Sequence, residues 1–237
     1  MRNQEIKTKL FHPRTDKFNF LALLKQDYDY STFRKMTKGI LQHPFGKNAL
    51  LANPLPKSIS ELRRNNITPH SGNVDTEIAW IMHSIEKNAE VINKYILLKK
   101  MFEKHILLNE YEKAENCLNK IEKEICYSNW GAQNRLLLLE EKDGTESNWL
   151  MLGKYSEQIK DPLSLFIIEQ SSKKAEKKLA YSRYKASFES IISETTGLLN
   201  EYLCFKILYP AFTGFEKFSF FINVESVSSI IDRYNIL

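Results

Sequence analysis

Proline is distributed very unevenly along this chain of 237 residues. Five of its seven prolines fall in the first seventy positions: Pro13, Pro44, Pro54, Pro56 and Pro69. Proline lacks a backbone N–H and clashes with the preceding helical turn, so helix interiors exclude it. Because only Pro162 and Pro210 follow Val74, the sequence predicts long helices there and short, interrupted elements before it.

The spacing of apolar residues predicts the longest helices. Asp75 is a candidate N-cap, and apolar residues then recur every three or four positions as far as Phe102, which predicts one helix ending near Asn109. A second amphipathic helix is predicted over residues 111–125. Two helices joined by so short a turn must pack as antiparallel neighbours.

The other elements complete an all-α prediction, either an irregular multi-helix bundle or a short helical-hairpin array. Shorter helices are predicted over residues 16–26, 31–41, 58–64, 130–142, 147–159, 162–193 (with a break near Ser171), 197–209 and 226–234. Residues 43–57 are expected to be irregular. The β-branched and aromatic residues near positions 215–224 are typical of strands, so a short β hairpin is an alternative there. We expect residues 1–73 to form an N-terminal cap region and residues 74–237 the main helical domain.

Composition narrows the class of protein. The three cysteines form no CxxC pair and are odd in number, so they predict neither a disulfide framework nor a metal site. The chain shows no signal peptide and no apolar run long enough to span a membrane, so we expect a cytoplasmic protein without membrane contact. The lysine-heavy composition indicates a microbial source. No cofactor motif is present, and none is expected.

One family resemblance lies in the predicted helical hairpin. The run from Asn109 to Ala114, with Leu118 and Ile121 beyond it, resembles the inter-helix turn and second helix of a tetratricopeptide repeat. Leu98 and Phe102 depart from that family's pattern, and no second copy follows at the family's spacing. The resemblance covers Asn109 to Ile121, about one repeat, and implies a helical hairpin with a turn like that of the family. An ordinary amphipathic αα-hairpin is the alternative.

The only candidate for catalysis is a short polar run before the long helices. Arg64 and Asn65, followed by His70, resemble the motif of HEPN-type ribonucleases, which are helical proteins that cut RNA without metal. The resemblance implies that His70 serves as general acid or base and that Arg64 neutralises the phosphorane. Pro69 departs from the usual helical setting of that motif. A polar loop without activity is the alternative.

A basic segment and an aromatic segment are the candidate binding surfaces. The basic segment concentrates positive charge on one predicted helix through Lys173, Lys174, Lys177, Lys178, Arg183 and Lys185. This basic segment could contact the phosphate backbone of a nucleic acid. The alternative is a charged helix face that is only exposed to solvent. The aromatic segment, residues 202–221, is either core or a partner surface that includes Phe212, Phe215, Phe218 and Phe221.

These features favour a non-enzymatic helical interaction or scaffold subunit of a larger intracellular complex, whose partner is another protein or a second copy of the chain. The first alternative is an accessory protein that binds RNA or DNA through Lys173–Lys185. The second alternative is a metal-independent endoribonuclease that uses Arg64, Asn65 and His70.

Overall fold

The computed structural model describes residues 3–63, 71–195, 197–208 and 215–237, and all regular structure within them is helical. This confirms the all-α prediction. The helices in chain order are α1 (Asn3–Leu10), α2 (Lys17–Asp27), α3 (Tyr30–Thr37), α4 (Pro44–Leu51), a 3-10 turn η1 (Ile59–Glu61), α5 (Val74–Lys87), α6 (Ala89–Leu107), α7 (Tyr111–Lys120), a π-helical turn η2 (Ile121–Ile125), α8 (Asn129–Asp143), α9 (Thr145–Gln158), α10 (Pro162–Ala175), α11 (Tyr181–Ile192), α12 (Leu198–Leu208), α13 (Phe215–Glu225) and α14 (Ile230–Ile236).

One sequence prediction about local structure was wrong, and one alternative that the sequence left open is excluded. Residues 43–57, expected to be irregular, contain α4, which begins at Pro44, a residue suited to a first helical turn. Residues 215–225 form α13 rather than a β hairpin, because their apolar side chains pack against α5, α12 and α14. Tertiary burial has overridden the strand propensity of the aromatic residues.

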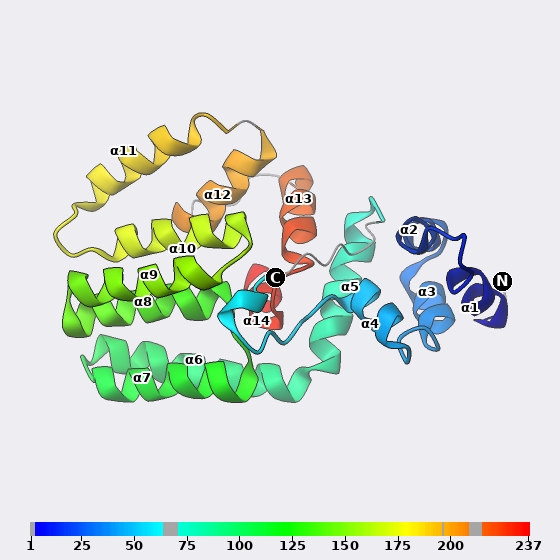
Figure 1. Cartoon of the computed structure of the whole chain (residues 1–237), viewed down its shortest axis with the longest axis horizontal. Helices are drawn as coiled ribbons and strands as arrows, with labels where there is room; N and C mark the ends of the chain where they lie inside the picture. Colours follow the sequence, from blue (N-terminus) through cyan, green and yellow to red (C-terminus); the bar gives the residue numbers. More distant parts are fainter. Residues whose placement is uncertain (1–2, 64–70, 196, 209–214) are drawn as a thin grey trace.

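The predicted long helix is two helices that meet at Asn88. Its N-cap is Asn73, whose side chain accepts a hydrogen bond from Thr76 N at 3.1 Å, and not Asp75. At Asn88 the side-chain amide, instead of the backbone N–H, donates to Ser84 O at 2.7 Å. An asparagine that competes with the backbone in this way ends α5, and α6 leaves in a new direction (Figure 1).

The predicted 162–193 helix breaks at residues 176–180, C-terminal to the expected site at Ser171. The buried carboxylate of Glu140 on α8 accepts hydrogen bonds from Lys177 N at 3.1 Å and Thr145 Oγ1 at 2.8 Å. Asn148 Nδ2 donates to the same carboxylate at 3.1 Å. These contacts fix the chain where α10 gives way to α11.

The pair α6–α7 is the predicted antiparallel hairpin. Asn109 turns the chain with a φ of 58°, a conformation that asparagine tolerates better than most residues, and Tyr111 donates to its Oδ1 at 2.9 Å. Ala114 is fully buried and lies in one cluster with Phe102. The geometry is that of an αα-hairpin, and the tetratricopeptide resemblance stays a prediction.

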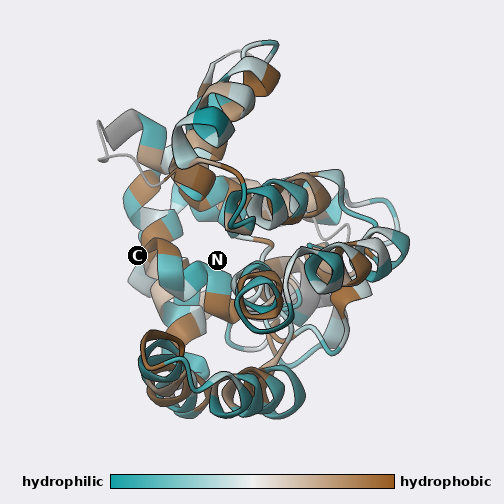
Figure 2. Cartoon of the chain, turned by 90° about the vertical axis from the view of Figure 1, so that its left-hand side faces the viewer, coloured by the Kyte–Doolittle hydropathy of each residue, from teal (hydrophilic) through white to brown (hydrophobic). Residues whose placement is uncertain are grey.

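Further helices stack on this hairpin as an array. α7 packs on α8, α8 pairs with α9, and α10 packs on both of them. The α6–α7, α8–α9 and α10–α11 turns lie at the same end of the molecule (Figure 1). Figure 2 views the array from that end, with several of its helices seen nearly end on.

Apolar side chains gather in several clusters. α1, α2, α3 and α4 share one cluster with Trp80 of α5, whereas α5 and the helices from α10 to α14 share another that contains Phe188 and Tyr202. α5 therefore contributes to both. No helix in the described ranges combines the length and apolar character needed to cross a membrane.

A candidate binding groove on the helical array

Two adjoining cavities, of about 290 and 240 Å³, open on the inner side of the array. Both are lined by Trp130, Gln133 and Lys206, so we treat them together and call them the central groove. Helices α6, α8, α10, α12 and α14 each contribute lining residues. The groove therefore exists only because separate segments of the chain are brought together.

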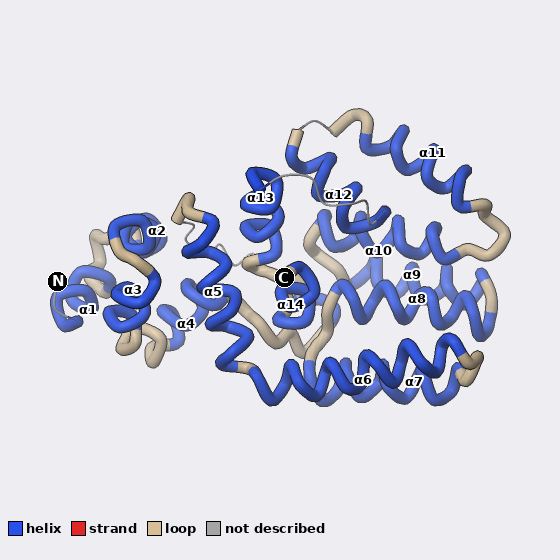
Figure 3. The backbone as a smooth tube through the Cα atoms, turned by 180° about the vertical axis from the view of Figure 1, so that it is seen from behind, coloured by secondary structure: helices blue, strands red, loops and turns tan. Residues whose placement is uncertain are grey.

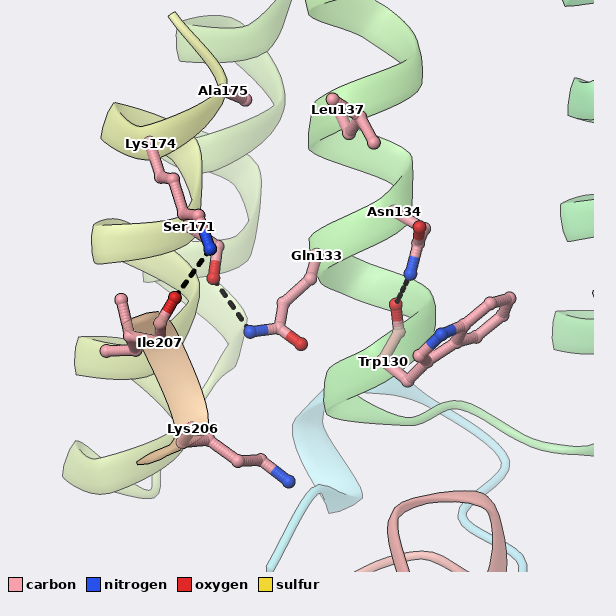
Figure 4. Close-up of a pocket in the computed structure, with 9 residues that line it drawn as sticks. All are labelled: Trp130, Gln133, Asn134, Leu137, Ser171, Lys174, Ala175, Lys206 and Ile207. Carbon is pink, nitrogen blue, oxygen red and sulfur yellow. Dashed lines mark hydrogen bonds between the residues drawn. The ribbon is translucent and has the colours of Figure 1, made fainter. Parts of the chain in front are cut away.

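One face of α8 lines the larger cavity, and two of its residues, Trp130 and Gln133, also line the smaller one. Trp130, Gln133, Asn134 and Leu137 follow the three- and four-residue steps that place side chains on one side of a helix (Figure 4). All four are half-buried. This face carries an aromatic ring, two amides and an aliphatic side chain in a row.

α14 fixes the N-terminus of α8, where Trp130 lies, through hydrogen bonds to the α8 backbone. The buried carboxylate of Asp232 accepts hydrogen bonds from the backbone N–H groups of Asn129 at 2.9 Å and Trp130 at 3.0 Å. Ser128 supplies the local N-cap to Gly131 N at 2.9 Å. Burial raises the pKa of Asp232, and the nearby Glu225 carboxylate raises it further, while Lys206 opposes the change. A carboxylate at a helix N-terminus satisfies donors that the helix itself leaves open.

Lys99 of α6 lies over the aromatic part of the groove. Its ammonium is 5.8 Å from the centre of the Trp130 ring and 5.9 Å from that of Tyr95, and it donates to Asn235 Oδ1 at 3.1 Å. The Tyr95 and Trp130 rings meet edge to face with centroids 5.2 Å apart. A cation held over aromatic faces keeps its charge available to an incoming anion.

Lys174 and Lys206 bring positive charge from the opposite side. Lys174 Nζ donates to Ile207 O at 2.6 Å, at the carboxyl end of α12 (Figure 4), and burial lowers the pKa of Lys174. Lys206 forms an ion pair with the fully buried Glu225, which also accepts from Tyr202 OH at 2.8 Å. Although burial opposes ionisation, Lys206 and Arg63 lower the pKa of Glu225.

The two amides on α8 have hydrogen-bonding capacity to spare. Gln133 Nε2 donates to Ser171 Oγ at 2.7 Å and Asn134 Nδ2 donates to Trp130 O at 2.8 Å (Figure 4). Within the described part of the chain, neither side-chain carbonyl oxygen accepts a hydrogen bond. An amide that combines a donor and an acceptor matches the alternating groups of a peptide backbone.

The predicted basic segment is not one helical face. Residues 176–180 separate Lys173 and Lys174 on α10 from Arg183 and Lys185 on α11. Lys177 pairs with Glu141 at 2.8 Å, whereas Lys174 belongs to the central groove. Lys173, Lys178, Arg183 and Lys185 are exposed, with Lys185 3.8 Å from Glu189.

The predicted aromatic surface belongs largely to the interior. Phe221 is 3 % exposed and belongs to the core, and Phe218 is half-buried and packs against the same core cluster. Phe212 lies outside the described residues, as does the side chain of Phe215. Arg64, Asn65 and His70 also lie outside them, so the ribonuclease motif stays a prediction.

Sequence reasoning did not identify the central groove. The signal in the sequence was the stripe at positions 130, 133, 134 and 137, which places two amides between an aromatic and an aliphatic side chain on one face of the helix.

In the described residues no group of three or more histidine, cysteine or acidic side chains is placed to hold a metal ion. Comparison with family models, curated proteins and solved structures gives no match.

Proposed function

We propose that this protein is a helical interaction subunit that binds an extended, acidic segment of a partner protein in the central groove. The observation that carries the proposal is the single face of α8 on which Trp130, Gln133 and Asn134 lie between lysines from three other helices. On such a surface the Trp130 ring offers an apolar contact and the two amides offer hydrogen bonds to the backbone of a partner. The lysines beside them recognise negative charge.

The charges of the groove favour an acidic partner. Lys99, Lys174 and Lys206 line it, against Glu103 and Asp232. The Asp232 carboxylate is engaged by the α8 backbone amides and by Ser229 Oγ at 2.8 Å, and Lys206 is paired with the buried Glu225. The remaining balance is Lys99 and Lys174 against the exposed Glu103. Complementary charge steers association and selects partners more than it adds affinity.

The shape of the groove favours an extended segment over a folded domain. Its lining comes from one side each of five helices, and most of those side chains are half-buried instead of protruding. A recessed surface of this kind suits a chain in extended conformation, whose backbone the Gln133 and Asn134 amides can pair with.

The test is selection of peptides by phage display on the wild-type protein, followed by affinity measurement with matched charge-reversal variants. Lys99→Glu removes the cation over Trp130, whereas Lys100→Glu makes the same change at an exposed neighbour on α6. We expect acidic peptides that bind Lys99→Glu about tenfold more weakly than wild type and bind Lys100→Glu unchanged.

A second groove variant, Gln133→Leu, separates backbone recognition from charge. Loss of affinity in both groove variants, with unchanged helical content, supports the proposal. Selected peptides without acidic residues, or equal binding to Lys99→Glu and wild type, would show that the central groove is not a site for acidic segments.

A further inference from the structure

A pocket of about 390 Å³ lies between α3 and α5, apart from the central groove. α3 and α5 pack side by side there, and Figure 3 shows them at the N-terminal end of the molecule. We call it the α3–α5 pocket. It is lined by Tyr30, Ser31, Arg34, Lys35, Lys38, Leu41, His83 and Lys87.

Four of its lining residues are cations, and none is an acid. Arg34, Lys35, Lys38 and Lys87 are all exposed, and no carboxylate in the described part of the chain lies within ion-pair distance of them. Arg34 and Lys38 stand one helical turn apart, and Lys87 faces them from the end of α5. Like charges repel one another, so a bound anion would stabilise this cluster of four cations.

A buried polar atom lies among these cations. His83 is only 2 % exposed, yet its Nδ1 has no hydrogen-bond partner in the described residues, and the nearest carboxylate oxygen, Glu86 Oε2, is 3.8 Å away. Edge-to-face contacts hold its ring, with centroids 5.7 Å from Trp80 and 6.2 Å from Tyr30. Buried polar atoms in proteins nearly always have a partner, so a missing one points to a ligand.

Three of the cations lie on α3 or at its C-terminal end, and Lys87 of α5 lines the same cavity, so positive charge reaches the cavity from two helices. A stripe of cations suits a nucleic-acid backbone, whereas a pocket of this size suits a small molecule. Arginine binds phosphate oxygens through two parallel N–H bonds, and lysine binds them as a point charge. The Tyr30 ring and Leu41 supply an apolar wall for the remainder of such a ligand.

We propose that the α3–α5 pocket binds a small, soluble phosphorylated ligand with two or more negative charges, such as a nucleoside polyphosphate. Arg34, Lys38 and Lys87 contact its phosphate oxygens, and His83 Nδ1 donates a hydrogen bond from inside the pocket. The site is independent of the central groove, so failure of either proposal leaves the other standing.

Calorimetric titration of the full chain with pyrophosphate and with ATP tests the proposal. The double variant Arg34→Glu/Lys38→Glu changes only exposed side chains, and Lys100→Glu is its control outside the pocket. We expect saturable binding by wild type and Lys100→Glu, and affinity at least about tenfold weaker in the double variant. Phosphatidic acid vesicles and a single-stranded oligonucleotide are titrated in parallel.

The His83 ring gives a second readout that a purely structural role would not change. Burial, together with Arg34 and Lys87, lowers the pKa of free His83, while Glu86 opposes the shift. A bound pyrophosphate favours the imidazolium, so the pKa of His83 followed by NMR is expected to rise when pyrophosphate is added. Binding of vesicles or oligonucleotide alone, or pyrophosphate binding that survives in the double variant, overturns the proposal.

Discussion

At the residue scale, His83 predicts how stability depends on pH. Its pKa in the folded protein lies below the ordinary value of 6.5, chiefly because of burial. Between these two pKa values the unfolded chain binds a proton that the folded chain does not, so the free energy of unfolding falls as pH drops through 6.5 toward the lower pKa of the folded protein. His83→Gln removes this contribution. Denaturant unfolding of both proteins across that range should show the wild type losing more stability than the variant.

The ring of His83 is also surrounded by Arg34, Lys87, Glu86 and Tyr30. Arg34 and Lys87 lower its pKa further, in the same direction as burial. Comparing wild type with His83→Gln cancels other groups that titrate in both proteins. Parallel stability curves for the two would contradict the assignment of a neutral, buried His83.

At the element scale, α14 holds the N-terminus of α8 through Asp232. Removing this carboxylate in Asp232→Ala leaves two buried backbone N–H groups without an acceptor, so we expect a loss of about 2–4 kcal/mol in the free energy of unfolding. Ser128→Ala, which removes only the local cap of α8, should cost about 1 kcal/mol. Denaturant unfolding followed by Trp fluorescence measures both. Equal losses would show that α14 does not hold α8.

At the scale of the whole molecule, α5 joins the N-terminal helices to the array. Lys25 of α2 forms a buried ion pair with Glu77 of α5 at 2.9 Å, and the same carboxylate accepts from Ser71 N at 2.8 Å. Breaking one side of a buried pair leaves an uncompensated charge, so Lys25→Met should cost about 3–5 kcal/mol. Gln26→Met, at the exposed neighbouring position, is the control. Circular dichroism during urea unfolding measures the difference, and similar stability of the two variants would contradict this role.

Residue spacing and turn chemistry alone determined the all-α class and most helices of the array. The predicted ranges 130–142 and 162–193 agree with the end of α8 and the start of α10. Gly144 ends α8 and Asp161 caps α10, and capping is a local interaction between neighbours in sequence. The α6–α7 hairpin followed in the same way from a short turn between two amphipathic helices.

Only the tertiary structure decided where long helices break, which aromatic rings are interior and where cavities form. Glu140 of α8 fixes the linker after α10 because the N–H that it accepts, that of Lys177, lies 37 residues further along the chain. The central groove draws on five helices, and the α3–α5 pocket joins residues 30–41 to residues 83–87. Periodicity reports which face of a helix is apolar, but the neighbour of that face, and hence any site between helices, is fixed by packing over long sequence distances.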